Sequence, residues 1–385
     1  MNKKIRVALA ILLFSMVAVI IVGNYYLKEI TQKNEKSYEI NIEKEQPIQE
    51  TNQRENNITT REGADRNPKK EEEVKETVPP EEKQENEANI ETSNKEDVKI
   101  ESDNSKQVGE EDVKAAMKIN NPNLTISAKN AILLRGNTKE VLFHKDALEK
   151  IQPASTAKLL TAIVAVEHAD SEEEFKVGNE IELIASDSSR AYLKKGQVLS
   201  LSQTLDALLL PSGNDTAYMI AVHIGRKIAG DTSLIKEEAV KVFVEEMNRT
   251  AKKIGAVHSN FCTPDGYDSE GQYTTAYDMA VIGANAIEYD LIVNTVKKEK
   301  ARDILLSGED ITWNNSNKLI IPGSGYYYKY AIGLKTGTST KAGKCLVSAA
   351  KIKGNTYVSV VMDASYEGRW QDSVDLLKYG VSSGS

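Results

Sequence analysis

Cysteine, tryptophan and histidine are scarce in this chain of 385 residues, which has two Cys, two Trp and four His. The histidines lack the spacing of a zinc site, so the sequence argues against a zinc peptidase, and each is expected to be structural. Cys262 and Cys345 would allow one disulfide in an exported protein, but nothing in the sequence brings them together, and unpaired buried thiols are expected. The four histidines are His144, His168, His223 and His258.

Charged residues are absent from the apolar run 7–22, which follows Lys3, Lys4 and Arg6. This layout is typical of a secretory signal or an N-terminal anchor. The flank 23–26 offers no small-x-small cleavage pattern and no lipid-accepting Cys, whereas its paired tyrosines suit a membrane interface. Residues 1–27 are therefore interpreted as an uncleaved membrane anchor, with a cleaved signal as the alternative. The rest of the chain is then expected outside the cytoplasm.

Leu, Phe, Trp and Cys are also absent from residues 28–118, where 16 Lys and Arg face 25 Asp and Glu, a net charge of −9. Such a segment cannot bury enough apolar surface to offset its ordering entropy, so a disordered charged linker is expected. The net charge of the whole chain, −8, therefore belongs to the linker and says nothing about a substrate.

Residues 119–385 have the apolar content and size of one large globular domain, or of two intimately packed subdomains. Two strands are predicted near its start and three near its end, with apolar helices between them. Because an isolated hairpin is marginal in water, the terminal strands are expected to share one antiparallel sheet, which gives an α+β domain. The predicted strands are 131–135, 141–144, 330–335, 345–351 and 357–363.

Three short motifs in this domain supply the parts of serine acyl transfer without a histidine base. Ser155 precedes a buried-helix pattern, so it is expected at a helix N-terminus, where N–H groups and the helix dipole stabilise developing negative charge. Lys158 lies one turn on, and burial would lower its pKa and allow it to act as a neutral base. The motifs are Ser155-Thr156-Ala157-Lys158, Ser212-Gly213-Asn214 and Lys335-Thr336-Gly337.

Placement separates these motifs from chance matches. Ser212 follows a helix broken by Pro211, and the Lys335 motif ends a predicted strand, so three distant elements are predicted to meet in one cleft. Similar patterns elsewhere fall in a polar stretch, within a strand or in the linker, and they are interpreted as chance. These are Ser233–Lys236, Ser348–Lys351 and Ser102–Asn104.

In this order, the motifs resemble those of the low-molecular-mass penicillin-binding proteins, specifically the serine D-alanyl-D-alanine carboxypeptidases. The resemblance extends over residues 119–380 and includes the stretches 207–217, 260–267 and 273–280. It implies the penicillin-binding/β-lactamase-like transpeptidase fold, an antiparallel sheet flanked by helices with a helical subdomain. It also implies removal of the terminal D-alanine from peptidoglycan stem pentapeptides through an acyl-serine intermediate.

The resemblance implies a role for each matching position. Ser155 would attack the carbonyl between the two terminal D-alanines, Lys158 would take its proton, and Ser212 would relay a proton to the leaving amine. The other positions would bind substrate. Asn214 would hydrogen-bond its backbone, Lys335 would supply positive potential, and Thr336 would hold its terminal carboxylate. Gly337 would allow close backbone approach, and the backbone N–H of Thr338 would form the oxyanion hole with that of Ser155.

The same resemblance implies β-lactam antibiotics as covalent inhibitors and a catalytic domain held outside a bacterial cell membrane. No metal, organic cofactor or nucleic-acid partner is expected. Some relatives have His directly after the third motif, so the role of the Thr338 side chain stays open. Others attach to the membrane through a C-terminal helix, which the N-terminal anchor and linker are expected to replace.

Three other activities stay open. A serine β-lactamase in its commonest form needs a glutamate to activate water. Glu245 and Glu246 follow Ser212 at a suitable sequence distance, but their surroundings have the pattern of an ordinary amphipathic helix. A transpeptidase or endopeptidase would use the same motifs, and a non-enzymatic β-lactam sensor would need a transducing segment. Tyr326–Tyr328 are expected to be half-buried strand residues, with a place in the cleft as the alternative.

Overall fold

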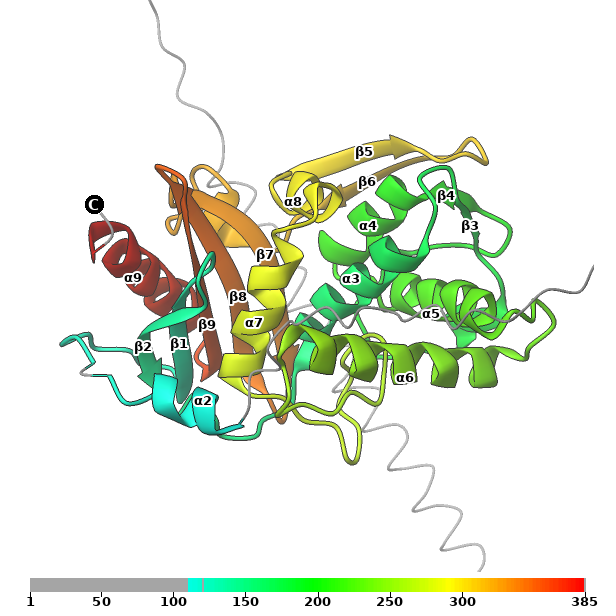
Figure 1. Cartoon of the computed structure of the whole chain (residues 1–385). Coiled ribbons are helices and arrows are strands. Elements are labelled where there is room, and N and C mark those ends of the chain that lie inside the picture. Colours follow the sequence, from blue (N-terminus) through cyan, green and yellow to red (C-terminus); the bar gives the residue numbers. More distant parts are fainter. Residues whose placement is uncertain (1–109, 120, 384–385) are drawn as a thin grey trace, which may run out of the picture. The chain divides into compact units, whose positions relative to one another are not determined.

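The computed structural model describes residues 110–119 and 121–383 of the chain (Figure 1). A five-stranded antiparallel sheet lies at the centre, with the strand order β2-β1-β9-β8-β7. Strands from both ends of the domain meet where β1 pairs with β9, so the predicted shared sheet is confirmed. The strands are β1 Asn130–Arg135, β2 Glu140–Lys145, β7 Ala331–Ser339, β8 Gly343–Ile352 and β9 Asn355–Ala364.

Helices cover both faces of this sheet (Figure 1). Helix α9, Gly368–Ser383, packs on one face, and α7, Ala276–Ala286, packs on the other. Successive residues of β1 point to opposite faces of the sheet. Ile132 packs into the apolar core on the α7 side, and Leu133 packs into the core on the α9 side. Because both faces are covered, β8 and β9 are buried along most of their length.

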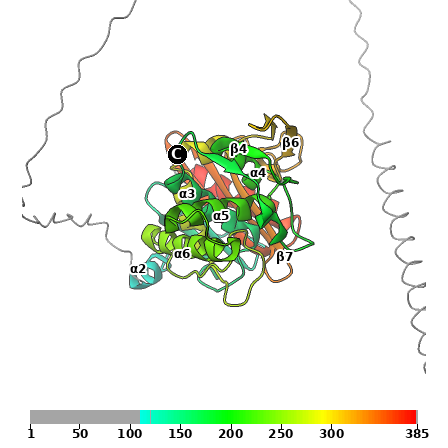
Figure 2. The same ribbon diagram turned by 90° about the vertical axis from the view of Figure 1, so that its right-hand side faces the viewer.

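The helical centre of the sequence forms a second region beside α7, and in Figure 2 α5 and α6 lie in front of the sheet. Its central helix, α3, is apolar nearly all round and has eight consecutive buried residues from its first position. This region includes α3 Lys158–His168, α4 Leu201–Leu209, α5 Asn214–Ala229, α6 Lys236–Ile254, α8 Asp290–Val296, and the hairpins β3 Glu174–Lys176 with β4 Val198–Ser200 and β5 Lys300–Ile304 with β6 Asp310–Asn314.

A short helix, α2, Glu110–Ala116, precedes the predicted start of the domain at residue 119. Val113 of this helix is fully buried in the apolar core, so the packed structure includes part of the segment that composition assigns to the linker. The predicted anchor, 1–27, and the linker up to residue 109 lie outside the described residues. Among the helices that the structure describes, none is both long and apolar enough to cross a bilayer.

Two local details differ from the sequence-based expectations. The Lys335 motif lies inside β7 rather than at its end, because Thr338 and Ser339 continue the pairing with β8. Tyr326–Tyr328 lie in the loop before β7 and not in a strand. The tyrosines do not line the cavity beside Ser155 either; Tyr326 instead packs near Trp370 of α9, with ring centroids 6.2 Å apart.

Candidate active site

Ser155 lies in the 3-10 turn Ala154–Ala157, which runs directly into α3. The preceding residue, Ala154, has a φ of 46°, in the left-handed region that non-glycine residues rarely adopt. Gly266, from a distant loop, packs against it so closely that a Cβ on Gly266 would lie 1.9 Å from the Ala154 carbonyl oxygen. The predicted helix-start position of Ser155 is therefore confirmed, and it depends on a contact from another loop.

Lys158, the first residue of α3, is fully buried. Its Nζ donates hydrogen bonds to Ser155 Oγ (3.0 Å), Asn214 Oδ1 (2.7 Å) and the Asp265 carbonyl oxygen (2.9 Å). Burial lowers the pKa of Lys158 to about 8, against the opposing attraction of Asp265 and then Asp215. At this pKa, about a tenth of the Lys158 side chains are neutral near pH 7 and able to accept the Ser155 proton.

Ser212 lies in the loop between α4 and α5, and Asn214 begins α5. The backbone of Ser212 has a φ of 67°, again in the left-handed region. Its carbonyl oxygen accepts a hydrogen bond from Ser189 Oγ at 2.6 Å, which ties this loop to the opposite wall of the site. The second motif is thus an inter-helix loop, as predicted, and Ser212 and Asn214 both line the cavity that Ser155 faces.

Buried Asp215 organises the wall that carries Ser189. Its carboxylate accepts the backbone N–H groups of Ala191 (2.9 Å) and Leu193 (3.1 Å), which lie in the same loop as Ser189. Because Asp215 is the second residue of α5, the Ser212 motif and this wall are fixed by one short segment.

Strand β7 supplies the third motif. Lys335 is fully buried beneath the site, and its Nζ donates to the Thr336 carbonyl oxygen at 3.1 Å. Burial lowers the pKa of Lys335 well below its ordinary value, and the positive charges of Lys158 and Arg369 lower it further. A bound anion at this point would favour the protonated lysine.

Glycine at position 337 of β7 allows a close approach. A Cβ there would lie 3.0 Å from Thr156 Cγ2 and 3.2 Å from Ala154 Cβ, in the turn that carries Ser155. The strand and the Ser155 turn can therefore lie side by side, which brings the Thr338 backbone to the same cavity as Ser155.

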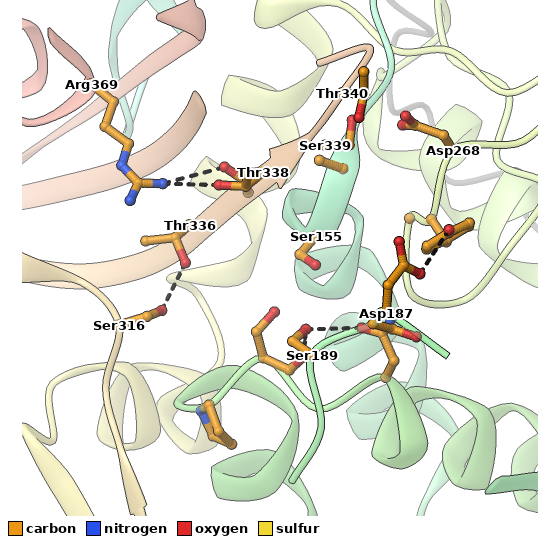
Figure 3. A pocket seen from close by; sticks show the side chains of 18 residues that line it. Ser155, Asp187, Ser189, Asp268, Ser316, Thr336, Thr338, Ser339, Thr340 and Arg369 are labelled. Atoms are coloured by element: carbon orange, nitrogen blue, oxygen red, sulfur yellow. Dashed lines mark hydrogen bonds between the residues drawn. The ribbon is translucent and has the colours of Figure 1, made fainter. Parts of the chain in front are cut away.

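These elements surround a cavity of about 460 Å³ (Figure 3). Two of the eight predicted site residues, Lys158 and Lys335, are fully buried and do not line it. The other six line the cavity directly: Ser155, Ser212, Asn214, Thr336, Gly337 and Thr338.

Arg369, on the first turn of α9, also lines this cavity and was not found by sequence reasoning. Its Nη1 donates to Thr338 Oγ1 (3.3 Å) and to the Gly337 carbonyl oxygen (3.4 Å) (Figure 3). Burial lowers its pKa, but a guanidinium stays charged, so Arg369 is a fixed cation beside Thr336 and Thr338. Other polar lining residues that the motifs do not include are Asp187, Ser188, Ser189, Tyr267, Asp268, Ser316, Ser339 and Thr340.

The remaining polar residues that the sequence singled out have structural partners. Neither Cys262 nor Cys345 is in a disulfide, as expected; Cys345 is buried, whereas Cys262 is only partly buried. Burial raises the pKa of Cys345 to about 12. The histidines are held by neighbouring groups, and no cluster that could hold a metal ion occurs in the described part of the chain. Their contacts are His144 N–H with Asn121, His168 with Glu246, His223 with Glu173, and His258 with Asp278.

The two glutamates considered for a β-lactamase lie on α6, away from the cavity. Glu246 instead contacts His168 Nε2 at 3.1 Å and pairs with Arg249. Of the residues that line the cavity in the described structure, none is a glutamate. The chance match in β8 behaves as expected, because Ser348 is buried and Lys351 is exposed, whereas Ser102–Asn104 lies outside the described residues.

Comparison with known proteins agrees with this geometry. A family model described as D-alanyl-D-alanine carboxypeptidase matches residues 115–366. The chain belongs to the D-alanyl-D-alanine carboxypeptidase family. It is 30% identical to the D-alanyl-D-alanine carboxypeptidase DacF of Bacillus subtilis over 63% of this chain and 59% of that protein. It is 29% identical to the carboxypeptidase of Streptomyces strain K15 over 67% of this chain and 88% of that protein.

Solved structures show the same fold. The crystal structure of the Streptomyces K15 DD-transpeptidase matches with a TM-score of 0.60 and 28% identity, over 69% of this chain and all of that chain. The predicted α+β transpeptidase fold is therefore confirmed. This D-alanyl-D-alanine carboxypeptidase family member spans about three fifths of the length of the Bacillus relative.

Gly266→Ala is expected to displace Ser155 without unfolding the domain. The new Cβ would meet the Ala154 carbonyl oxygen at 1.9 Å, and shifting the nucleophile by about 1 Å can slow a reaction about 100-fold. The measurement is the second-order rate of Ser155 acylation by a labelled penicillin, with circular dichroism as the check on folding.

Gly271→Ala is the matched control. This residue lies in the same loop with a similar φ, 75° against 78°, but a Cβ there would meet only Cys262 Sγ, at 4.0 Å. The backbone strain is therefore the same and the steric contact is missing. Equal acylation rates in the two variants would contradict the account of how Ser155 is held.

Proposed function

We propose that this protein is a serine D-alanyl-D-alanine carboxypeptidase that removes the terminal D-alanine from peptidoglycan stem pentapeptides. One observation supports the proposal most strongly. A fully buried lysine with a pKa of about 8 lies 3.0 Å from a serine hydroxyl at a helix start. This pair can generate a nucleophile without a histidine.

In the acylation step, Ser155 Oγ attacks the carbonyl carbon of the penultimate D-alanine, and Lys158 takes the hydroxyl proton. The tetrahedral oxyanion is stabilised by the backbone N–H groups of Ser155 and Thr338; losing one such donor typically costs about 3 kcal/mol in the barrier. Ser212 relays a proton to the leaving amine of the last D-alanine, and Asn214 holds the substrate backbone. The C–N bond breaks, and the acyl group stays on Ser155.

The free carboxylate of the last D-alanine is recognised at the other end of the cavity. The Thr336 hydroxyl, which is 2.7 Å from the Ser316 hydroxyl, can donate a hydrogen bond to this carboxylate. The Arg369 guanidinium supplies a fixed positive charge, and Lys335 adds another when the bound carboxylate favours its protonated form. A β-lactam carries an equivalent carboxylate, so it is expected to enter the same site and acylate Ser155.

Water then hydrolyses the acyl-enzyme. A transpeptidase differs only in its acyl acceptor, an amine in place of water, and the K15 relative carries that name in its crystal structure. Transpeptidation is therefore the second candidate function. A β-lactamase of the glutamate-dependent kind has less support, because no glutamate lines the cavity in the described residues.

We also propose that the N-terminal segment anchors the protein in the bacterial cell membrane, with the catalytic domain on the outer side. Support comes from the sequence alone: Lys3, Lys4 and Arg6 precede the uncharged run 7–22, and basic residues favour the cytoplasmic side. The charged linker would then let the domain reach the cell wall away from the bilayer.

Incubation with a D-Ala-D-Ala-terminated pentapeptide is expected to release free D-alanine. Ser155→Ala should lower that rate by about 10⁴-fold or more, because the nucleophile is lost. Ser186→Ala, an exposed serine, is the control and should keep full activity. Rapid turnover of a labelled penicillin without D-alanine release would show a β-lactamase instead, and stable acylation without peptide cleavage would show a sensor.

Deleting residues 1–109 is expected to release the protein from membranes into the soluble fraction. This deletion keeps α2, whose Val113 is part of the core, so the domain should fold and react with penicillin as the full chain does. The measurement is the distribution of the protein between membrane and soluble fractions after a high-salt wash. A truncated protein that stays with the membranes would refute the anchor.

A further inference from the structure

A second polar cavity, of about 290 Å³, lies beside the turn between β7 and β8. We call it the lysine cavity, because three lysines line it. It is lined by Lys129, Asn130, Glu149, Lys150, Ile151, Gln152, Gln272, Tyr273, Lys341 and Asp363. No step of the proposed reaction uses any of these side chains.

Asn130 is the first sign that the lysine cavity is an ordered polar site. The residue is fully buried, and its Nδ2 donates to the Asp146 carbonyl oxygen (2.9 Å) and to Glu149 Oε2 (3.1 Å). Its Oδ1 is buried and has no hydrogen-bond partner in the described structure. This atom has almost no accessible surface, so Asn130 orders the wall of the cavity through its two donated hydrogen bonds and does not itself contact a ligand.

The lysines are the second sign. Lys129 is paired with Glu149 at 2.8 Å, and Lys150 Nζ lies 3.8 Å from the centre of the Tyr273 ring. Lys341 makes no ion pair within the described residues, although its backbone N–H donates to Asp268 Oδ2 at 3.3 Å. With three lysines against Glu149 and Asp363, the cavity carries an excess positive charge that suits a carboxylate.

The lysine cavity adjoins the active site. Three chain segments each contribute to both cavities: Thr340 lines the active site and Lys341 the lysine cavity, and the same holds for Ala154 with Gln152 and for Asp268 with Gln272. Thr340 and Lys341 are consecutive, with Cα atoms about 3.8 Å apart, so the two cavities lie on either side of a ridge to which these segments contribute.

The proposed substrate pose leads toward that ridge. In Figure 3, Arg369 and Thr336 lie on one side of Ser155, and Thr340 and Asp268 lie on the other. If the terminal carboxylate binds beside Arg369, the acyl part of the peptide leaves Ser155 toward Thr340. The next residue of the turn, Lys341, belongs to the lysine cavity.

We propose that the lysine cavity is an accessory subsite that holds a carboxylate-bearing segment of the stem peptide on the acyl side of the scissile bond. Lys150 and Lys341 bind the carboxylate of this segment. This inference rests on the proposed carboxypeptidase function. It adds a preference for substrates with a free carboxylate upstream of D-Ala-D-Ala.

The test compares two pentapeptides, L-Ala-γ-D-Glu-L-Lys-D-Ala-D-Ala and the same peptide with the glutamate α-carboxylate amidated. Binding to the full chain carrying Ser155→Ala is measured by calorimetry, so chemistry is not needed. The acid should bind about tenfold more tightly than the amide, the scale of one charge-assisted contact. Adding Lys150→Gln and Lys341→Gln should remove this difference and leave amide binding unchanged.

Lys378→Gln, an exposed lysine on α9, is the control and should keep the preference. A chain with Ser155 intact and both cavity lysines replaced should react with labelled penicillin at the normal rate, which checks folding and the catalytic site. Equal affinities for acid and amide in the protein with its lysines would overturn the subsite. Failure of both peptides to bind would instead overturn the carboxypeptidase proposal on which it rests.

Discussion

The contact between buried Lys158 and Ser155 is the constraint on which the rest of the site depends. A lysine in water would hold its proton at neutral pH and could not serve as a base. Removing it from water disfavours the charged form, and the nearby carboxylates of Asp265 and Asp215 limit that shift to a pKa of about 8. The site thus replaces a histidine by a lysine whose surroundings set its proton affinity.

Holding that contact requires three separate parts of the fold. The apolar α3 buries the lysine, the loop at Gly266 fixes the strained Ala154 before the serine, and β7 approaches the same turn at Gly337. Three non-glycine residues with positive φ, Ala154, Ser212 and Leu334, occur at the elements that carry the three motifs. Their strain, of order 1–3 kcal/mol each, is offset by the packed core around them.

Local patterns made much of this structure predictable. Ser155 and Lys158 lie on one helical turn, and the terminal strands alternate or run apolar in a way that requires a shared sheet. The order and placement of the three motifs then predict that they meet in one cleft. The three-residue spacing in the Ser348–Lys351 match, by contrast, falls on a strand, where the buried serine and exposed lysine cannot act together.

Other features depend on tertiary packing, which one sequence does not reveal. Arg369 reaches the cavity only because α9 folds back over the sheet, and nothing in its neighbours' spacing marks it. The carbonyl oxygen of Asp265 is a backbone group, so no side-chain pattern could assign its contact with Lys158. The Tyr326–Tyr328 run has strand propensity, but Gly323 and Gly325 adopt positive φ and keep the segment a loop.

The most direct test of the central claim is the pH dependence of Ser155 acylation by a labelled penicillin, measured as a second-order rate between pH 5.5 and 9.5. Only neutral Lys158 accepts the serine proton, and burial lowers its pKa to about 8. The rate should therefore rise about tenfold per pH unit well below 8 and level off above it. A rate that is independent of pH across this range would contradict Lys158 as the base.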